Sequence, residues 1–139
     1  HRDLHSFPTR RSSYLEITYN AIGTTEKKMN QETFDKYFTK DSLIISNFHG
    51  YGDTLKNIIA NYTTNTRISA HGFSEQGSTT TPFLMLTMNG ASRYDLAIDA
   101  AKRLGREELV IKYQDKITKN QAYAIENGVD LPEIQDYNF

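Results

Sequence analysis

Apolar residues in the first half of the chain recur with two different spacings. In residues 30–40 the aromatic side chains Phe34, Tyr37 and Phe38 stand three and four positions apart, a spacing that predicts a short amphipathic helix. The run Leu43–Phe48 is instead almost continuously apolar and β-branched, with glycines after it. Such a run is typical of a strand buried on both faces of a parallel sheet. A helix followed by a buried strand is therefore expected here.

A second helix and a second strand follow that run. Asp53 is the expected N-cap of the helix, and its apolar face consists of Leu55, Ile58, Ile59 and Tyr62. Residues 66–73 then form a second short strand. Strand, helix and strand in succession predict a crossover unit, so we expect Leu43–Phe48 and Ile68–His71 to be adjacent and parallel. The predicted fold is a small three-layer α/β domain with a mainly parallel mixed sheet.

In the second half of the chain, residues typical of helix ends predict three helices. Thr81 precedes Pro82, which favours Thr81 as the N-cap of a short apolar helix ended by Asn89-Gly90. Ser92 and Asp95 resemble a capping box at the start of a helix that Gly105 ends. The last helix covers residues 106–127, with Gly128 just beyond it. The apolar stripes of the two longer helices are Tyr94, Ala97, Ile98, Ala101 and Leu104, and then Val110, Tyr113, Ile117 and Ala124 with Asn120 or Gln121 between them. The predicted core includes Leu43, Ile45, Ile58, Ile59, Ile98 and Ala101.

Residues 1–14 do not follow either apolar pattern. The segment is rich in arginine and serine and poor in acids, which fits a transit-type leader. It also resembles translated sequencing-library adapter joined to a truncated gene, and we favour this second interpretation. Residues 1–14 are then expected to pack on nothing, and residues 15–139 form the domain. The segment Tyr14–Ile22 alternates loosely and predicts a strand.

The composition of the chain excludes several classes of protein and of binding site. A formal net charge of −1 gives no broad attraction for nucleic acid or anionic lipid. The chain has no cysteine, which excludes disulfides and thiolate metal sites and suits a reducing compartment. The longest apolar run, Phe83–Met88, is too short to span a bilayer. A cytoplasmic protein that binds neither nucleic acid nor membrane is expected, and the mixed charges Lys112, Asp115, Lys116 and Lys119 indicate a solvated helix face.

Two histidine-glycine pairs end the two predicted strands. His49-Gly50 and His71-Gly72 would lie at the same carboxyl edge of a parallel sheet, where open α/β sheets bind ligands. The alternative is that each glycine permits a tight exit turn and each histidine packs beside it. This alternative is favoured, because two histidines without a third ligand do not define a site.

A run of hydroxyl residues precedes the predicted short helix. Ser78, Thr79, Thr80 and Thr81 surround a helix N-terminus, which can accept a phosphate, but their spacing matches no phosphate-binding motif. A capped helix after a hydroxyl-rich loop is favoured. No catalytic, cofactor-binding or metal-binding residue is assigned. The weak candidates for an anion site or an interface are His49, His71, Ser78, Thr79, Thr80, Thr81 and Arg93.

Four local patterns occur in an order that resembles the C-terminal domain of phosphoketolases. They are "FHGYGDTLKNII", "RISAHGFSEQGSTTTPFLM", "NGASRYDLAIDAAKR" and "GVDLPEIQDYNF". The most specific pieces are the loop Gly77–Phe83, the helix start Ser92–Tyr94 and the tail Asp130–Ile134. The resemblance runs from about Met29, and faintly from Glu16, to Phe139. The sequence departs from the family at Leu84, where members usually have an acid, at Asp95, where they often have histidine, and in the chain end, which is often rich in tryptophan.

The resemblance implies a thiamine diphosphate and Mg enzyme related to transketolase. Such enzymes cleave xylulose 5-phosphate, often also fructose 6-phosphate, with inorganic phosphate to acetyl phosphate and an aldose phosphate. It further implies that two preceding domains hold the cofactor at a homodimer interface and that this domain resembles the transketolase C-terminal domain. This chain alone is then expected to bind no cofactor and to be inactive. Apolar residues around Thr79–Met88 are expected to be exposed where the missing domains packed.

Two other classes of function stay open on the residues alone. One is a stand-alone anion-binding or regulatory α/β module that uses the histidine edge or the threonine loop. The other is a purely structural dimerisation domain. Thiamine diphosphate domains encoded upstream would favour the enzyme, whereas a start codon just before residue 15 would favour the other two.

Overall fold

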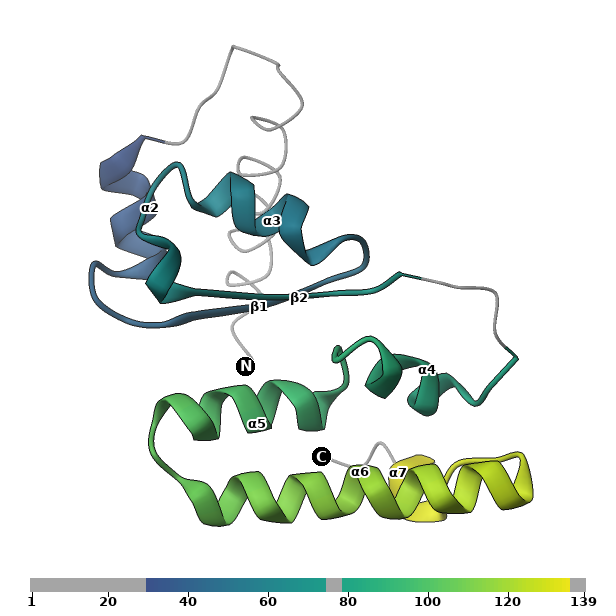
Figure 1. Ribbon diagram of the computed structural model, residues 1–139. Coiled ribbons are helices and arrows are strands. Elements are labelled where there is room, and N and C mark those ends of the chain that lie inside the picture. The colour runs from purple at the N-terminus through teal and green to yellow at the C-terminus, as the bar shows by residue number, and fades with distance from the viewer. Residues whose placement is uncertain (1–29, 75–78, 136–139) are drawn as a thin grey trace, which may run out of the picture. The chain divides into compact units, whose positions relative to one another are not determined.

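The computed structural model describes residues 30–74 and 79–135 of the chain (Figure 1). Its helices and strands, with the labels of Figure 1, are α2 (Gln31–Phe38), β1 (Ile44–Phe48), α3 (Gly52–Ile59), a 3-10 turn (Asn65–Arg67), β2 (Ile68–Gly72), α4 (Pro82–Met88), α5 (Arg93–Arg103), α6 (Glu107–Asn127) and α7 (Pro132–Gln135). They form two compact units. The first contains residues 30–44 and 53–69, and the second contains residues 45–52, 70–74 and 79–135. The segments 1–14 and Tyr14–Ile22, together with Ser78 and the chain end, lie outside the described residues.

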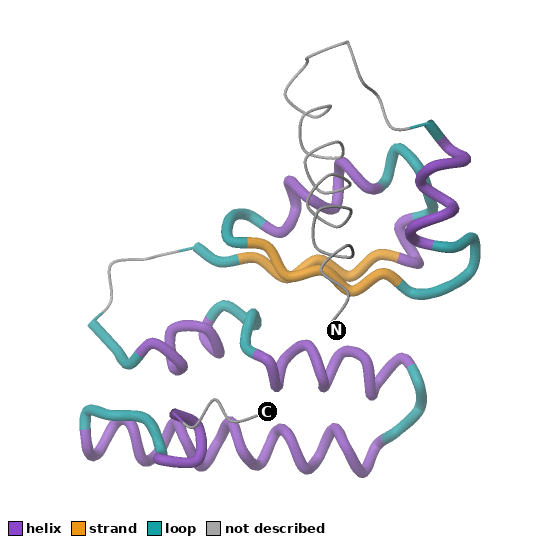
Figure 2. Tube along the Cα trace, turned by 180° about the vertical axis from the view of Figure 1, so that it is seen from behind, coloured by secondary structure: helices purple, strands orange, loops and turns teal. Residues whose placement is uncertain are grey.

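The two strands are neighbours in a parallel sheet, and α3 connects them (Figure 2). The prediction of a mixed α/β fold with adjacent parallel strands is confirmed. The glycines after the strands have a steric role, because a Cβ atom on Gly72 would collide with the backbone nitrogen of Gly52 and the carbonyl oxygen of Gly50. The backbone nitrogen of Phe73 donates to that same Gly50 oxygen at 2.8 Å. Only glycine permits so close an approach of two backbones.

Two predicted details of the first crossover were wrong. α3 begins at Gly52, so Asp53 lies in its first turn and is not the N-cap. The strand begins at Ile44, which is 7% exposed, whereas Leu43 is 43% exposed and Ile45 is half-buried. Because side chains alternate between the faces of a strand, a shift of one residue exchanges the buried set. The three consecutive apolar residues at the start of this run carry no alternation from which that register can be read.

The first unit packs around Phe34, which is fully buried. Its ring stacks on Phe38 at 4.7 Å and on Tyr62 at 4.8 Å between centroids. Tyr37, predicted on the same face, is 42% exposed. Arg67 closes the unit, because its guanidinium donates to the carbonyl oxygens of Phe38, Thr39 and Ser42 at 2.8–3.2 Å. Aromatic stacking and a carbonyl-binding arginine thus fix the end of α2.

The second unit is built on the antiparallel pair α5 and α6 (Figure 1). Its buried residues include Ile98, Ala101, Ile117, Ala124 and Ile134. Leu104 was predicted on the α5 stripe but is 71% exposed, because it is the C-cap, where the helix has already ended. Between the predicted positions on α6, Asn120 is buried and Gln121 is exposed. No helix within the described ranges is both long and apolar enough to cross a bilayer.

The helix ends of the second unit follow the predicted signals. Thr81 accepts a hydrogen bond from the backbone nitrogen of Leu84 at the start of α4. Ser92 and Asp95 form a reciprocal capping box at the start of α5. Gly128 ends α6 in the left-handed conformation, with φ of 72°. Short-range rules therefore predicted these ends correctly.

Gly128→Ala should destabilise the second unit by about 1 kcal/mol, since alanine adopts positive φ at a cost. A Cβ atom there would meet nothing within 4 Å, so the cost is conformational rather than steric. Gly128→Asn should lose less, because asparagine tolerates this conformation. Chemical denaturation followed by circular dichroism measures both, and equal losses would contradict the conformational explanation.

Candidate functional site

Three separate segments of the chain meet at the buried carboxylate of Asp130. The Thr81 hydroxyl donates to its Oδ1 at 2.6 Å, and the Asn120 amide donates to the same oxygen at 2.8 Å. The backbone nitrogen of Phe83 donates to Oδ2 at 3.3 Å. Asp130, Asn120 and Thr81 are 7%, 1% and 8% exposed. We call these four residues the Asp130 cluster.

The Asp130 cluster also fixes the start of the tail. The Oδ1 atom of Asn120 accepts a hydrogen bond from the backbone nitrogen of Leu131 at 2.8 Å. The side-chain amide of Gln135 donates to the carbonyl oxygen of Asp130 at 2.6 Å. Buried polar groups are tolerated when they are hydrogen-bonded. One carboxylate thus joins the start of α4, the middle of α6 and the turn before α7.

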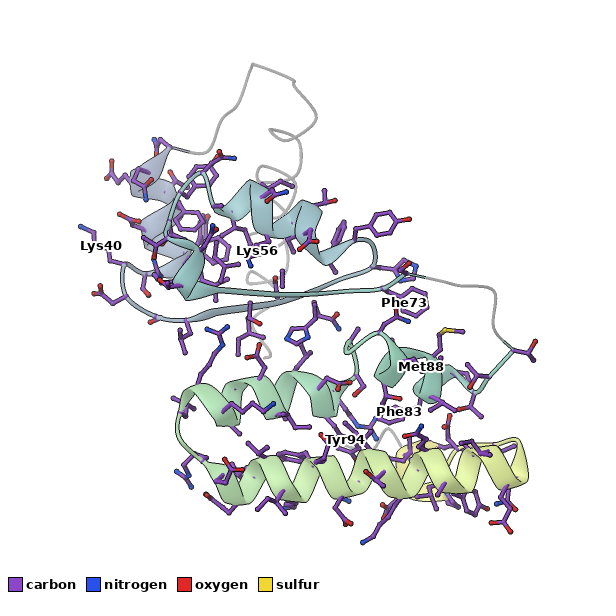
Figure 3. All side chains as sticks on the ribbon, in the orientation of Figure 1. Lys40, Lys56, Phe73, Phe83, Met88 and Tyr94 are labelled. Carbon is purple, nitrogen blue, oxygen red and sulfur yellow. The ribbon has the colours of Figure 1, made fainter. Side chains whose placement is uncertain are left out.

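Arg93 adds a second connection to the tail. Its guanidinium donates to the carbonyl oxygen of Ile134 at 3.1 Å, and it lies over the rings of Phe83 and Tyr94 at 5.3 and 5.1 Å. These two rings meet edge to face at 5.6 Å (Figure 3). Arginine over aromatic rings is attracted to their π faces. The helix start at Arg93 is thereby linked to α4 and α7.

A pocket of about 500 Å³ opens beside this cluster. Its lining residues are Thr80, Thr81, Pro82, Phe83, Gly128, Val129, Asp130, Ile134 and Gln135. A carboxylate of the chain itself occupies the start of α4, the place at which a phosphate was considered. Thr81 donates to that carboxylate, Thr80 lines the pocket and Thr79 is exposed. The threonines therefore form a cap and a loop, and Asp130 would repel an added anion.

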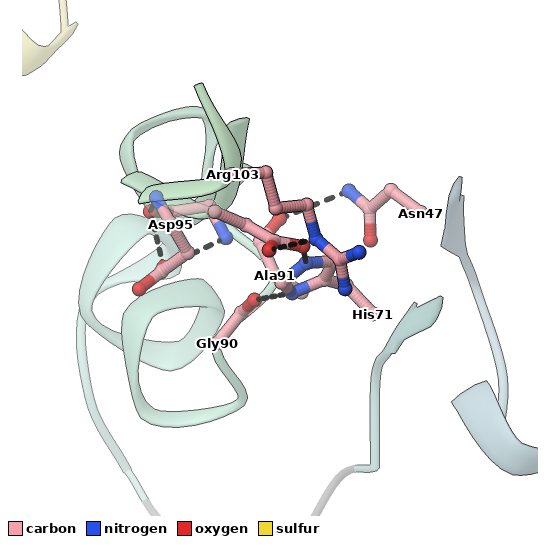
Figure 4. Close-up of polar contacts among 8 residues, drawn as sticks. Asn47, His71, Gly90, Ala91, Asp95 and Arg103 are labelled. Carbon is pink, nitrogen blue, oxygen red and sulfur yellow. Dashed lines mark hydrogen bonds and ion pairs between the residues drawn. The ribbon is translucent and has the colours of Figure 1, made fainter. Parts of the chain in front are cut away.

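A second polar cluster surrounds His71 at the end of β2 (Figure 4). Its Nδ1 atom lies 2.6 Å from the carbonyl oxygen of Gly90, and its Nε2 atom lies 2.9 Å from Oδ2 of Asp99. Arg103 donates from Nε to the other Asp99 oxygen at 2.8 Å. Asn47 of β1 donates to the carbonyl oxygen of Ala91 at 2.9 Å. Both strands thus contact the turn between α4 and α5.

His49 has different surroundings from His71. Its side chain is exposed and stacks on Phe73, with centroids 5.3 Å apart. The two histidines therefore have different partners. Within the described ranges, no three histidine, aspartate or glutamate side chains gather in a way that would hold a metal ion.

The apolar residues of α4 are exposed to different degrees. Phe83 is buried, and Met88 is 62% exposed. Leu84, Met85 and Leu86 are half-buried. The expected exposure around Thr79–Met88 therefore holds for Met88 and in part for the three residues between.

The charged face of α6 is solvated, and Lys119 and Asp115 form an ion pair within it. Lys119 donates to Asp115 at 2.6 Å, and this hydrogen bond, together with the charge of Asp115, raises the pKa of Lys119.

Asp115→Asn should move the pKa of Lys119 back toward its ordinary value in an NMR titration, whereas Glu108→Gln on the same helix should not. A raised pKa contributes stability below the unfolded-state value and loses it as pH rises through the folded-state value. Both side chains are more than half exposed, so little change in stability should follow.

Sequence reasoning missed the acidic partners in both clusters. Asp130 was recognised only as part of a tail motif, and Asn120 only as one of two positions on an apolar stripe. A polar residue on such a stripe is itself a signal of a buried hydrogen bond. Asp99 and Arg103 stand four apart on one helix, the spacing of an ion pair, but nothing in that spacing points to His71.

Comparison with known sequences shows the family to which the chain belongs. The sequence model of the XFP C-terminal domain matches residues 17–139. The chain belongs to this family. It is 37% identical over 114 residues to a probable phosphoketolase of Bradyrhizobium diazoefficiens, 33% over 116 residues to one of Rhodopseudomonas palustris and 34% over 116 residues to one of Brucella abortus. These alignments cover 78–80% of this chain and 14–15% of the relatives.

The chain thus spans only a small part of the length of the relatives that it matches. The resemblance noted from local motifs is confirmed. Its three most specific pieces are neighbours in space, since Thr81 and Phe83 contact Asp130, and Arg93 contacts Ile134. The three pieces therefore pack against one another.

Proposed function

We propose that this chain is the C-terminal part of a phosphoketolase. The complete enzyme would cleave xylulose 5-phosphate, fructose 6-phosphate or both with inorganic phosphate, giving acetyl phosphate and an aldose phosphate. The observation that carries the proposal is the family match over residues 17–139. The relatives are named probable phosphoketolases. A three-layer α/β architecture like that of the transketolase C-terminal domain, and a cytoplasmic location, belong to the same proposal.

Within that enzyme the domain would have a structural role. Asp130 and Arg93 join secondary-structure elements through their hydrogen bonds. Thiamine diphosphate enzymes need groups that bind a diphosphate and a Mg ion. Within the described ranges no three histidine, aspartate or glutamate side chains gather as metal ligands, and the buried carboxylate of Asp130 already binds three donors of the chain. We therefore assign no catalytic step to these residues.

Partners of the domain follow from the same proposal. The chain spans about 15% of the length of its curated relatives, so most of the enzyme would lie in preceding domains. We propose that this domain packs on those domains, and that the complete enzyme is a homodimer that binds neither nucleic acid nor membrane.

The experiment is to titrate the purified 139-residue chain with thiamine diphosphate and Mg, and to assay acetyl phosphate from xylulose 5-phosphate and phosphate. We expect no saturable binding and no turnover. The Bradyrhizobium relative, assayed in parallel, is the positive control. Saturable binding or turnover by the chain alone would overturn the structural role and would move the active site onto this domain.

A further inference from the structure

The dipeptide Asn-Gly occurs twice in the sequence, at Asn89-Gly90 and at Asn127-Gly128. It is a reactive pair, because the backbone nitrogen of the glycine can attack the side-chain carbonyl carbon of the asparagine. Glycine favours this attack, since it has no Cβ atom beside the nitrogen and its backbone reaches conformations closed to other residues. Both pairs lie at a helix end, with Asn89 as the C-cap of α4 and Asn127 as the last residue of α6. The sequence therefore gives both pairs the same reactivity, and only the structure separates them.

The side-chain amide of Asn89 is hydrogen-bonded at both of its polar atoms. Its Oδ1 atom accepts from the backbone nitrogen of Ser74 at 2.9 Å, and its Nδ2 atom donates to the carbonyl oxygen of Met85 at 2.9 Å. The turn that follows is held as well, because the carbonyl oxygen of Ala91 accepts from the Asn47 side chain at 2.9 Å (Figure 4). Asn89 is also half-buried. Turning its amide toward the next backbone nitrogen would break contacts with other segments of the unit.

Asn127 is exposed, and among the described residues its side chain bonds only within the last turn of α6. Its Nδ2 atom donates to the carbonyl oxygen of Tyr123 at 2.9 Å, and the backbone nitrogen of Gly128 donates to that of Ala124 at 2.9 Å. Gly128 is exposed as well and has a φ of 72°. The last turn of a helix frays at little cost in free energy, and fraying here breaks both bonds together. The nitrogen of Gly128 and the amide of Asn127 can then meet.

We propose that Asn127 is a site of spontaneous deamidation and that the fold protects Asn89 from the same reaction. The nitrogen of Gly128 forms a bond to the side-chain carbonyl carbon of Asn127, and the bond from that carbon to the amide nitrogen breaks. The amide nitrogen takes up the proton that Gly128 loses and leaves as ammonia, so the product is a cyclic succinimide. Water then opens the ring at one of its two carbonyl carbons and gives aspartate or isoaspartate. The inference goes beyond the proposed enzyme, since it concerns this domain whatever its reaction.

Both products place a new carboxylate at the C-terminal end of α6. This end of a helix carries the negative end of the macrodipole, so an added negative charge is unfavourable there. Isoaspartate also inserts an extra carbon into the main chain, three residues before Asp130. The connection that places Asp130 against Thr81 and Asn120 is thereby lengthened. Deamidated protein should therefore unfold at a lower temperature than fresh protein.

The test is a time course of the complete 139-residue chain at neutral pH and physiological temperature. Peptide mapping by mass spectrometry gives the amounts of aspartate and isoaspartate at the two positions. We expect Asn127 to react at least about tenfold faster than Asn89, since about tenfold corresponds to the one or two additional hydrogen bonds that hold Asn89. In the chain unfolded in urea the two rates should become similar, because both asparagines precede glycine. Equal rates in the folded chain, or the same difference in urea, would overturn the proposal.

A matched pair of variants tests the cause of the protection. Asn47→Ala removes the side chain that binds Ala91, so it should raise the rate at Asn89 and leave the rate at Asn127 unchanged. Gln121→Ala, on the exposed surface of α6, should change neither rate. If Asn89 reacts no faster in Asn47→Ala than in the wild type, the contacts of this turn do not protect it and the proposal fails. The comparison of folded and unfolded wild-type chain decides the matter even if Asn47→Ala does not fold.

Discussion

We expect Asp130→Ala to lower the free energy of unfolding by about 3–5 kcal/mol. The carboxylate binds the Thr81 hydroxyl, the Asn120 amide and the backbone nitrogen of Phe83. Its removal leaves buried donors without acceptors, and each such group costs about 1–3 kcal/mol. Thermal or urea unfolding of the complete chain, followed by circular dichroism, gives the loss.

Glu133→Ala provides the matched control for this prediction. Glu133 lies three residues further along the tail, its side chain is 57% exposed, and it contacts Lys116 at 3.5 Å. Exposed ion pairs of this kind contribute about 0–1 kcal/mol. Similar losses in the two variants would show that Asp130 does not organise a buried cluster.

We expect Ile98→Asp to cost several kcal/mol or to prevent folding of the second unit. Ile98 is 7% exposed on α5, the helix that packs on α6. The change buries a carboxylate without a partner and removes apolar contacts, and either effect alone ranks among the largest single-residue losses. Circular dichroism and the dispersion of NMR signals show whether the unit still folds.

The same substitution at Ile111 separates burial from helix propensity. Ile111 lies on α6 and is 64% exposed, so Ile111→Asp should change stability by no more than about 0.5 kcal/mol. Equal damage at the two positions would contradict the assignment of Ile98 to the core.

Helix ends and the crossover could be predicted from the sequence because their causes are local. Thr81 before Pro82, Ser92 with Asp95, and Gly128 after a long helix each satisfy backbone groups within a few residues. The register of β1 could not be read, since Leu43, Ile44 and Ile45 are equally apolar and only packing selects the buried one. The exposure of Leu104 follows from the helix ending one residue earlier than its stripe suggests.

The two clusters depend on long-range contacts and were harder to foresee. Asp130 and Thr81 are 49 positions apart, and His71 and Asp99 are 28 apart. No periodic pattern links such pairs, although each member carries a polar group that must find a partner when buried. His49 and His71 were predicted at the same edge of the sheet because each lies at the end of a strand and before a glycine. The structure gives the two histidines different partners.

Domain exchange tests the central claim, that residues 17–139 serve as the C-terminal domain of a phosphoketolase. The Bradyrhizobium relative would be truncated before its matching segment and joined to residues 17–139 of this chain, with the truncated relative as the control. The measurement is the initial rate of acetyl phosphate formation from xylulose 5-phosphate and phosphate. We predict that the truncated relative is inactive and that the chimera recovers a rate within about tenfold of the parent, a difference of about 1.4 kcal/mol in the barrier. A chimera that folds and assembles like the parent but forms acetyl phosphate no faster than the truncated relative would contradict the claim.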